Sequence, residues 1–391
     1  MNGWYDVRDY DAKGDGQQPD HVAIQAAINA AAANGGGVVW LPPGTYLLQA
    51  GITVTEQVQI VGAGWPAHWV EGQRNPGTWI RVEDEGFSAF TVKASGATIR
   101  DVAFVYDQER SNPLRNGWEP RNFQHAIHVW GTDVTLDGIH LYNATRGILV
   151  NHPSGVIGRV SLNRIWGQPL QEGIYIDNAH DVIKVNNVHL WPFWTDALGD
   201  KRKTEGLYAR EYQKQHGVAI RSGRNDNPHF SNIFALGYGH GFLFQYRNGG
   251  KDDSGPTSKF MIVNADLDFC GKAIEVNGLD TTGQIVNLNA QGDKEDIVGI
   301  ALTALSARVQ ATNIRLTHFP TNAIRVNNHC VIHLSNIWIQ DWNFTQKEHR
   351  FPGIEVVDAH SQVILGRPFY FEQGEGILKA PDTGGNGKIV N

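Results

Sequence analysis

The sequence predicts an all-β fold, a parallel β-helix of about ten or more coils with an N-terminal capping α-helix. Three observations support this prediction. A phrase of one small residue followed by apolar-x-apolar recurs from residue 126 onward, at intervals that cluster near about 24 residues. A second phrase of alternating apolar residues lies between its copies, and one strong helical pattern precedes the first copy.

The first phrase predicts the main buried strand of each coil. Its copies include Ala126-Ile-His-Val, Gly147-Ile-Leu-Val, Gly173-Ile-Tyr-Ile, Gly217-Val-Ala-Ile, Gly241-Phe-Leu-Phe and Ala273-Ile-Glu-Val. The second phrase, as in 134–141 and 331–339, alternates apolar and polar residues, which is typical of a strand with one buried face. The Asn or Asp-Gly in its middle indicates a bend. Two or three short strands per ~24 residues fit stacked coils about 4.8 Å apart, whereas propeller blades need about 40 to 50 residues.

The helical pattern begins at Asp20 and ends at Gly35, with an acidic first residue, apolar spacing and a glycine stop. A β-helix leaves an open end that invites aggregation, so we expect this helix to cover that end. We therefore predict one domain over residues 1–391, with a cap region over residues 1–60. Loop insertions are expected at 106–124, 191–216 and 247–258.

The composition limits the partners that we expect. There are 33 basic and 40 acidic residues, a net charge of -7, which gives no electrostatic footprint for nucleic acid. No apolar run reaches the ~18 residues of a membrane helix. Two cysteines, Cys270 and Cys330, do not make a disulfide framework. The first residues lack the apolar core of a signal peptide. We expect an extracellular protein whose signal was trimmed, or one that leaves the cell another way, for example on a virion.

The stretch Tyr5-Asp-Val-Arg-Asp-Tyr-Asp-Ala-Lys-Gly-Asp-Gly, the helix, and Gly37-Val-Val-Trp-Leu-Pro-Pro-Gly-Thr-Tyr together resemble the N-terminal signature of the pectate-lyase-like superfamily. This right-handed β-helix group is related to polygalacturonases and includes phage tailspike depolymerases. The signature covers about the first 60 residues, and the coil pattern covers the rest. The resemblance implies the right-handed fold. It leaves the reaction open, because members are hydrolases, lyases, epimerases or non-enzymatic.

Stacked coils place the residue before each first phrase in one column, which reads His125, Arg146, Glu172, His216, His240 and Lys272. The long loops beside this column are rich in aromatic and cationic side chains, which suit a sugar chain. The alternative is a turn position that is polar for structural reasons. We predict as catalytic Glu172, His240, His216, Asp177 and Asp226. We predict as substrate-binding His125, Arg146, Lys272, Tyr238, Arg224, Asp268, Trp118, Trp191 and Trp194.

Gly239-His240-Gly241 resembles the Gly-His-Gly histidine of polygalacturonases, but the acids of that family are missing. Their positions read Leu170-Gln171-Glu172 and Lys214-Gln215-His216. Two carboxylates are needed for glycoside hydrolysis. Coils two apart are ~9.6 Å apart, so we expect Glu172 and an acid near His240 to suit an inverting pair. Asp268 and Glu275 lie on the coil beyond His240.

We therefore expect an endo-acting glycoside hydrolase that binds a polysaccharide. One alternative is a lyase that cleaves a uronate-containing glycan by β-elimination, with a cation for the carboxylate and a base for the C5 proton. The parts for this are Arg146, His216, His240, Lys272 and Tyr238. Another alternative is a glycan-binding spike without catalysis.

We expect no cofactor and no dedicated metal site. The alternative is calcium held by the carboxylate oxygens of Glu172, Asp177 and Asp226, since calcium prefers oxygen ligands. The resemblance to tailspikes adds a homotrimer to the monomer as an expected state.

Overall fold

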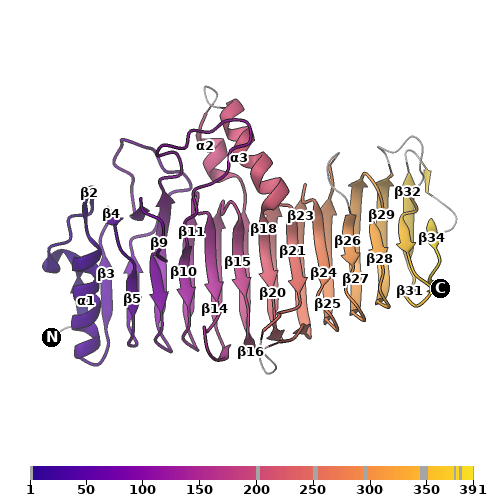
Figure 1. Ribbon diagram of the computed structural model, residues 1–391, viewed down its shortest axis with the longest axis horizontal. Helices are drawn as coiled ribbons and strands as arrows, with labels where there is room; N and C mark the ends of the chain where they lie inside the picture. Colours follow the sequence, from indigo (N-terminus) through magenta and orange to yellow (C-terminus); the bar gives the residue numbers. More distant parts are fainter. Residues whose placement is uncertain are drawn as a thin grey trace. The chain divides into compact units, whose positions relative to one another are not determined.

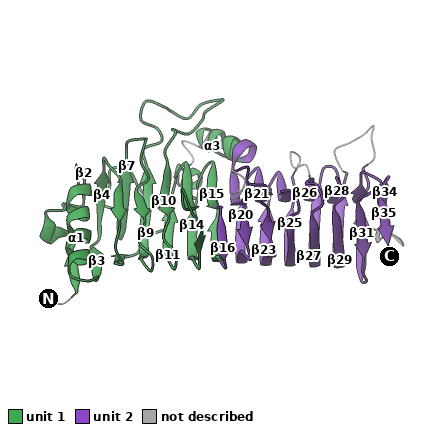
Figure 2. Ribbon diagram, turned by 60° about the horizontal axis from the view of Figure 1, so that its bottom comes forward, with its two compact units in different colours: residues 1–175, 183–213 green, residues 176–182, 214–391 purple. Residues whose placement is uncertain are grey.

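The computed structural model describes residues 3–199, 203–249, 254–293, 298–343, 351–373, 376–377 and 381–390. Its strands pair in parallel from coil to coil, as Ile127 with Ile148 and Leu136 with Leu162 show (Figure 1). The fold is the right-handed parallel β-helix that the sequence predicts. The coils group into two compact units, residues 1–175 with 183–213 and residues 176–182 with 214–391 (Figure 2). The single domain expected over residues 1–391 stays a prediction.

Unit 1 contains two parallel sheets. The first consists of β5 (Ile52–Val54), β8 (Phe90–Val92), β10 (His125–Val129), β12 (Arg146–Val150) and β15 (Glu172–Ile176). The second consists of β1 (Trp4–Asp6), β2 (Asp15–Pro19), β3 (Val38–Leu41), β4 (Gly44–Leu48), β6 (Gln59–Gly62), β7 (Thr78–Val82), β9 (Thr98–Tyr106), β11 (Thr135–Leu141), β14 (Ser161–Gly167) and β17 (Lys184–Leu190). A short strand, β13 (Ile157–Gly158), lies outside both.

Unit 2 has the same organisation. Its first sheet consists of β18 (Val218–Ser222), β21 (His240–Gln245), β24 (Lys272–Asn277), β26 (Val298–Leu302), β28 (Ile324–Val326), β30 (Ile354–Val356) and β34 (Thr383–Gly385). Its second sheet consists of β20 (His229–Leu236), β23 (Phe260–Asp268), β25 (Thr282–Gln291), β27 (Arg308–Phe319), β29 (Val331–Trp342), β31 (Gln362–Leu365), β32 (Phe369–Gln373), β33 (Gly376–Ile377) and β35 (Lys388–Val390). Three short strands of this unit belong to a third sheet: β16 (Ala179–Asp181), β19 (Asn225–Asp226) and β22 (Thr257–Ser258).

The predicted bend inside the second phrase is an asparagine ladder in unit 2. One asparagine in each of five successive strands has a positive φ of 48–59°: Asn232, Asn264, Asn287, Asn313 and Asn336. Asparagine tolerates this left-handed conformation better than other residues with a side chain. The side-chain amides of the last four donate to the asparagine of the preceding coil, at 2.6–3.1 Å. The ladder bends every coil at the same place and keeps the coils in register.

The predicted capping helix is α1 (His21–Ala33), at the N-terminal end of the coils (Figure 1). It buries Ala23, Ile24, Ala27, Ile28 and Ala31, one apolar stripe of the helix. Asp20 precedes it but does not cap it with its side chain. Its carboxylate instead accepts the backbone N–H groups of Lys13, at 2.5 Å, and Gly14, at 3.1 Å. Asp20 therefore holds Lys13 and Gly14, in the segment before the helix, in place.

The segment expected as a loop at 191–216 contains two helices, α2 (Phe193–Ala197) and α3 (Lys203–His216). That part of the prediction is wrong because aromatic side chains of this segment pack into a buried cluster rather than into a solvated loop. Residues 107–124 are irregular, as predicted. The 247–258 insertion is described only outside 250–253.

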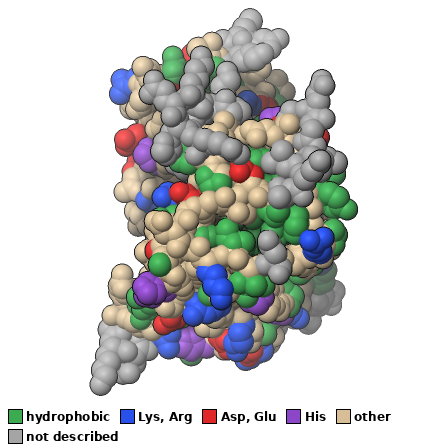
Figure 3. All heavy atoms as spheres, turned by 90° about the vertical axis from the view of Figure 1, so that its right-hand side faces the viewer, with side chains coloured by type: hydrophobic (Ala, Val, Ile, Leu, Met, Phe, Trp, Pro, Cys, Tyr) green, Lys and Arg blue, Asp and Glu red, His purple; other side chains and the backbone are tan. Residues whose placement is uncertain are grey.

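Acidic, basic and apolar side chains are interspersed on the face at the C-terminal end of the chain (Figure 3). No single charge covers that face, which agrees with the small net charge of the sequence. Within the described residues, no helix combines the length and hydropathy needed to span a membrane.

Candidate functional site

In unit 1, three predicted site residues lie at the starts of strands of the first sheet. His125 begins β10, Arg146 begins β12 and Glu172 begins β15, and His125 pairs with Arg146 in register. His125 Nε2 lies 2.8 Å from Glu172 Oε1, and their side chains are only 13% and 11% exposed. Arg146 Nη1 donates to Asn122 Oδ1 at 3.0 Å and to the Phe123 carbonyl at 2.8 Å. The predicted column is therefore real here, and its arginine is tied to the loop that precedes β10.

In unit 2, His240 begins β21 and pairs in register with Lys272, which begins β24. Glu275, three residues further along β24, joins them. Its Oε2 lies 2.7 Å from His240 Nε2, and its Oε1 accepts from Lys272 Nζ at 2.7 Å and from Thr303 Oγ1 at 3.3 Å. The Glu275 side chain is 8% exposed, whereas those of His240 and Lys272 are about one quarter exposed. A buried carboxylate thus holds two more accessible side chains.

The Glu275 carboxylate is ionised under ordinary conditions. Burial by itself raises the pKa of Glu275, but hydrogen bonds from His240 and Lys272 outweigh burial and lower it to about 2. Because an ionised carboxylate only accepts hydrogen bonds, His240 must carry a proton on Nε2. The Nδ1 atom of a neutral His240 then keeps its lone pair. The cluster offers a base at His240 Nδ1 beside a cation at Lys272 Nζ.

The two glycines that flank His240 have a steric explanation. A Cβ atom at Gly241 would lie 2.6 Å from the Ala273 carbonyl, and one at Gly239 would lie 2.9 Å from the Lys214 carbonyl. These distances are too short for a real Cβ atom. Gly239-His240-Gly241 therefore satisfies close coil contacts, and the motif alone carries no catalytic information.

The predicted place of His216 in the column is wrong. His216 is the exposed last residue of α3, and Val218 pairs with His240 in register. The inserted helix moves the strand start two residues past the histidine. Because His216 belongs to the inserted helix α3 and not to a coil strand, the repeat does not predict its position.

Asp177 anchors a turn in unit 2. It is 3% exposed, and its Oδ1 accepts the backbone N–H groups of Arg224 at 3.0 Å and Asn178 at 3.1 Å. Arg247 Nη1 donates to its Oδ2. The predicted binding residue Arg224 also contacts Asn178 Oδ1, at 3.4 Å. The structure gives both residues a structural role, and their predicted functional roles stay predictions.

Asp226 lies on β19 of the third sheet, away from the strands that hold His240 and Lys272. Its Oδ1 pairs with Lys259 Nζ at 2.7 Å, with both side chains well exposed. Among the described residues, no group of three or more His, Cys, Asp or Glu side chains is placed to hold a metal ion. The calcium alternative, which needs Asp177 and Asp226 together with Glu172, stays a prediction.

Two predicted binding aromatics are buried, and their predicted role in substrate binding stays a prediction. Tyr238 is 0% exposed, and burial raises the pKa of its hydroxyl well above its usual value. Trp118 is 3% exposed and packs with its ring centroid 5.8 Å from that of Trp194. The hydrophobic effect draws these rings into the core and under the loops. Trp191, by contrast, is 38% exposed.

Trp194 is nearly buried but still lines a pocket of about 920 Å³ in unit 1. Trp69 and Tyr142 add further aromatic lining, and Arg81 and Arg110 lie beside the acids Glu71, Glu83, Asp107 and Glu109. The predicted binding of a sugar chain by aromatic and cationic loops stays a prediction. Most of the residues that line this pocket lie outside the predicted set.

Asp268 ends β23 in unit 2. Burial, followed by the neighbouring Asp266 carboxylate, raises the pKa of Asp268 to about 6. It is therefore a carboxyl group that exchanges a proton near neutral pH. Its predicted role in substrate binding stays a prediction.

The sequence named Glu275 only as an acid near His240 and did not place it in the predicted catalytic or binding sets. The predicted column contains only the residue before each phrase. The third residue of each phrase forms a second column, in which Glu275 pairs with Leu243 and Ala301. A charged residue between these apolar neighbours, one coil from His240, marks the position.

Comparisons of sequence place similarity at the N-terminus. Residues 4–78 match the family described as rhamnogalacturonase A/epimerase, pectate lyase-like. The mannuronan C5-epimerase AlgE6 of Azotobacter vinelandii is 49% identical over 67 residues, 15% of this chain and 8% of that protein. Alginate lyase 7 of the same organism is 48% identical over 67 residues, again 15% and 8%. The similarity thus spans only a small part of these relatives.

Solved structures match nearly the whole chain. The A-module of the A. vinelandii mannuronan C-5 epimerase AlgE4 has a TM-score of 0.60 at 15% identity and covers 99% of this chain and 100% of the module. The pre-mature bacteriophage phi29 gene product 12 has a TM-score of 0.63 at 14% identity, covering 95% and 53%. An exopolygalacturonase of Thermotoga maritima has a TM-score of 0.59 at 10% identity, covering 96% and 93%. Identities this low concern the fold alone.

Proposed function

The chain has the pectate-lyase-like right-handed β-helix fold, and on this basis we propose that it acts on a polysaccharide that contains uronate sugars. The reaction is proton transfer at C5 of the uronate, leading to β-elimination or to epimerisation. The observation that supports this proposal is the cluster of His240, Lys272 and Glu275. The named activities of the N-terminal relatives, mannuronan C5-epimerase and alginate lyase, belong to the same chemical class.

In the proposed reaction, Lys272 Nζ binds the uronate carboxylate and stabilises the negative charge that develops there when C5 loses its proton. His240 Nδ1 takes that proton, while Glu275 holds the imidazole by Nε2. The electron pair left at C5 has two outcomes. It expels the oxygen on C4, which takes a proton from water as it leaves, and an unsaturated sugar forms. Alternatively C5 takes a proton from water on its other face, which gives the epimer.

A hydrolase needs a protonated carboxylic acid beside a second carboxylate. Glu275 does not suit the acid role, because its pKa of about 2 leaves it ionised. His240 as a base and Lys272 as a cation, both held by Glu275, suit C5 proton transfer better. This is why we place lyase or epimerase chemistry ahead of the hydrolase expected from the sequence.

One test follows three products from polymannuronate and polyguluronate. Ultraviolet absorbance reports unsaturated uronates, a reducing-end assay reports all chain cleavage, and proton NMR reports a change of epimer. The proposal predicts unsaturated ends or a changed epimer ratio. New reducing ends without unsaturation would instead establish hydrolysis.

Glycoside hydrolysis is the second candidate, and Asp268 is the observation that favours it. With a pKa of about 6, Asp268 holds the proton that a general acid needs at mildly acidic pH. Glycan binding without turnover is the third candidate. It predicts saturable binding to a polymer from which none of the three assays detects a product.

We propose an extracellular or virion-associated place for the chain, where such polymers are met. The structural likeness to a bacteriophage protein is compatible with the virion. The chain works as a monomer or a homotrimer in this proposal. Light scattering coupled to size exclusion distinguishes the two states.

A further inference from the structure

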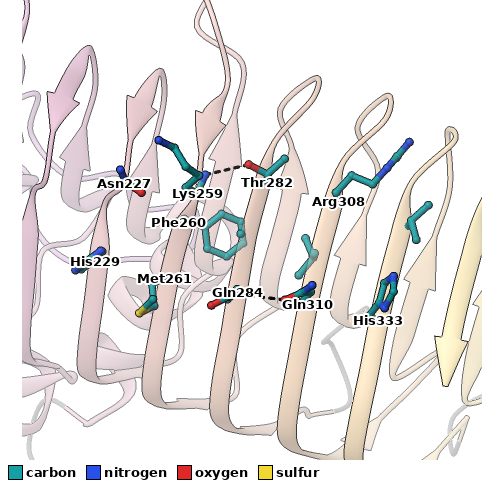
Figure 4. A pocket seen from close by; sticks show the side chains of 13 residues that line it. Asn227, His229, Lys259, Phe260, Met261, Thr282, Gln284, Arg308, Gln310 and His333 are labelled. Atoms are coloured by element: carbon teal, nitrogen blue, oxygen red, sulfur yellow. Dashed lines mark hydrogen bonds between the residues drawn. The ribbon is translucent and has the colours of Figure 1, made fainter. Parts of the chain in front are cut away.

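The second sheet of unit 2 carries a groove on its outer side, with no residue in common with the His240 cluster. One pocket of about 520 Å³ is lined by residues of β20, β23, β25, β27 and β29 (Figure 4). A second pocket of about 430 Å³ shares Gln284, Gln310 and His333 with it. The two pockets form one groove that crosses the strands of successive coils.

A register column forms the wall of this groove. His229, Met261, Gln284, Gln310 and His333 follow one another as paired residues on five neighbouring strands (Figure 4). Parallel strands repeat about every 4.8 Å, so the groove presents one side chain at each such step. An elongated ligand with repeating units is the kind of molecule that fits a wall of this form.

The middle of the column is suited to hydroxyl groups. Gln284 Nε2 donates to Gln310 Oε1 at 3.1 Å (Figure 4). Among the described residues, neither of these two amides makes another hydrogen bond to a side chain. This leaves the Gln284 oxygen as an acceptor and the Gln310 nitrogen as a donor. The hydroxyl groups of a sugar donate to the Gln284 oxygen and accept from the Gln310 nitrogen.

The charges around the groove are positive. Lys259 and Arg308 lie at one edge, and the histidines at the two ends of the column add protonatable groups (Figure 4). Lys259 is paired with Asp226, but Arg308 Nη1 donates to the backbone carbonyls of Ser306, Ala307 and His329. Within the described part of the chain, no acidic side chain lines either pocket. The groove therefore favours an anion.

Part of the groove is apolar. Met261 is 36% exposed at its wall. The Phe260 ring lies where Gly283 lacks a side chain, since a Cβ atom there would be 2.3 Å from Phe260 Cγ, and this ring is buried beneath the groove. The exposed Met261 side chain is therefore the apolar group that can pack against the face of a sugar ring.

We propose that this groove is a binding subsite for an acidic oligosaccharide whose sugars bear carboxylates, and that it holds this ligand without cleaving it. The cations bind the carboxylates, the amides bind hydroxyls, and Met261 contacts a ring face. The proposal goes beyond the proposed function, because the groove shares no residue with the His240 cluster and needs no turnover.

Methionine methyl NMR tests the proposal with little ambiguity, because the sequence contains only Met1 and Met261. The protein is labelled at the methionine methyl carbon, and Met261→Leu assigns the signal. The probe is a mannuronate tetrasaccharide, and cellotetraose is the neutral control. We expect the Met261 signal to shift saturably with the uronate and not with the neutral sugar.

Variants separate this subsite from the His240 cluster. His333→Ala and Gln310→Ala should each weaken the titration several-fold, and Arg308→Gln should weaken it roughly tenfold, the loss of one charged contact. Lys272→Met should leave the titration unchanged, whether or not the cluster turns over substrate. His333→Ala and Gln310→Ala keep the test decisive if Arg308→Gln misfolds.

Three outcomes would overturn the proposal. The first is no shift of the Met261 signal, and the second is an equal shift with cellotetraose. The third is a shift that Lys272→Met abolishes while the groove variants retain it.

Discussion

His240 Nε2 lies 2.7 Å from Glu275 Oε2, and the same carboxylate accepts from Lys272 at its other oxygen. One buried anion therefore sets the position of two groups with different tasks. Removing the anion should disturb both groups, whereas changing either partner should disturb only its own task. The variants Lys272→Met and Glu275→Gln test this difference.

Lys272→Met should raise KM for a uronate polymer by roughly ten- to a hundredfold, because a charge-assisted contact to the carboxylate is lost. Steady-state kinetics on polymannuronate measure the change. Arg325→Met is the matched control, since Arg325 lies on β28 of the same sheet and pairs with Glu355. Equal effects of the two variants would show that Lys272 acts only through general charge.

Glu275→Gln should make the protein less sensitive to acid. The folded-state pKa of Glu275, about 2, lies below the usual value of about 4.3, so ionisation stabilises the fold above pH 4.3. That stabilisation, on the order of 3 kcal/mol, is lost as the pH falls from about 4.3 to 2. Thermal unfolding across this range should show a flatter curve for the variant. A curve parallel to the wild type would contradict the pairing.

His140→Phe should flatten the stability curve in a higher window. His140 is fully buried on β11 with its ring stacked on Trp65 at 4.6 Å, and burial lowers its pKa to about 3. Between about pH 6.5 and 3 the unfolded chain binds a proton that the folded chain does not. Stability then falls as pH falls, by up to about 1.4 kcal/mol per pH unit. A slope for His140→Phe that is parallel to the wild type would contradict this account of His140.

Asp177→Ala should lower the free energy of unfolding by about 3 kcal/mol, because two backbone N–H groups and Arg247 lose a buried partner. Asp226→Ala is the control and should cost less than about 0.5 kcal/mol, since its pair with Lys259 is exposed. Denaturant unfolding compares them. Similar losses would rule out an anchoring role that is specific to Asp177.

The coil architecture could be predicted because the same residue pattern recurs in successive coils. Period, bend residue and capping helix each leave a local pattern, and the pairing of His240 with Lys272 follows from the repeat alone. His216 shows where this ends, because an inserted helix has its own periodicity and shifts the strand start by two residues.

Exposure was harder to predict than position. Trp118 and Tyr238 lie in segments that the sequence placed beside the column, yet both are buried. Tryptophan and tyrosine serve cores and sugar sites equally well, so residue type does not distinguish them. Glu275 was named from the sequence only as an acid near His240, since its contacts with His240 and Lys272 depend on how the coils stack.

The most direct test of C5 proton transfer uses proton NMR of polymannuronate incubated in D₂O with the wild type and with His240→Gln. The account predicts deuterium at C5, or a C4–C5 double bond, with the wild type, and a rate about 10²- to 10⁴-fold lower with the variant. New reducing ends with neither a C4–C5 double bond nor deuterium at C5 would contradict it, as would an unchanged rate in the variant.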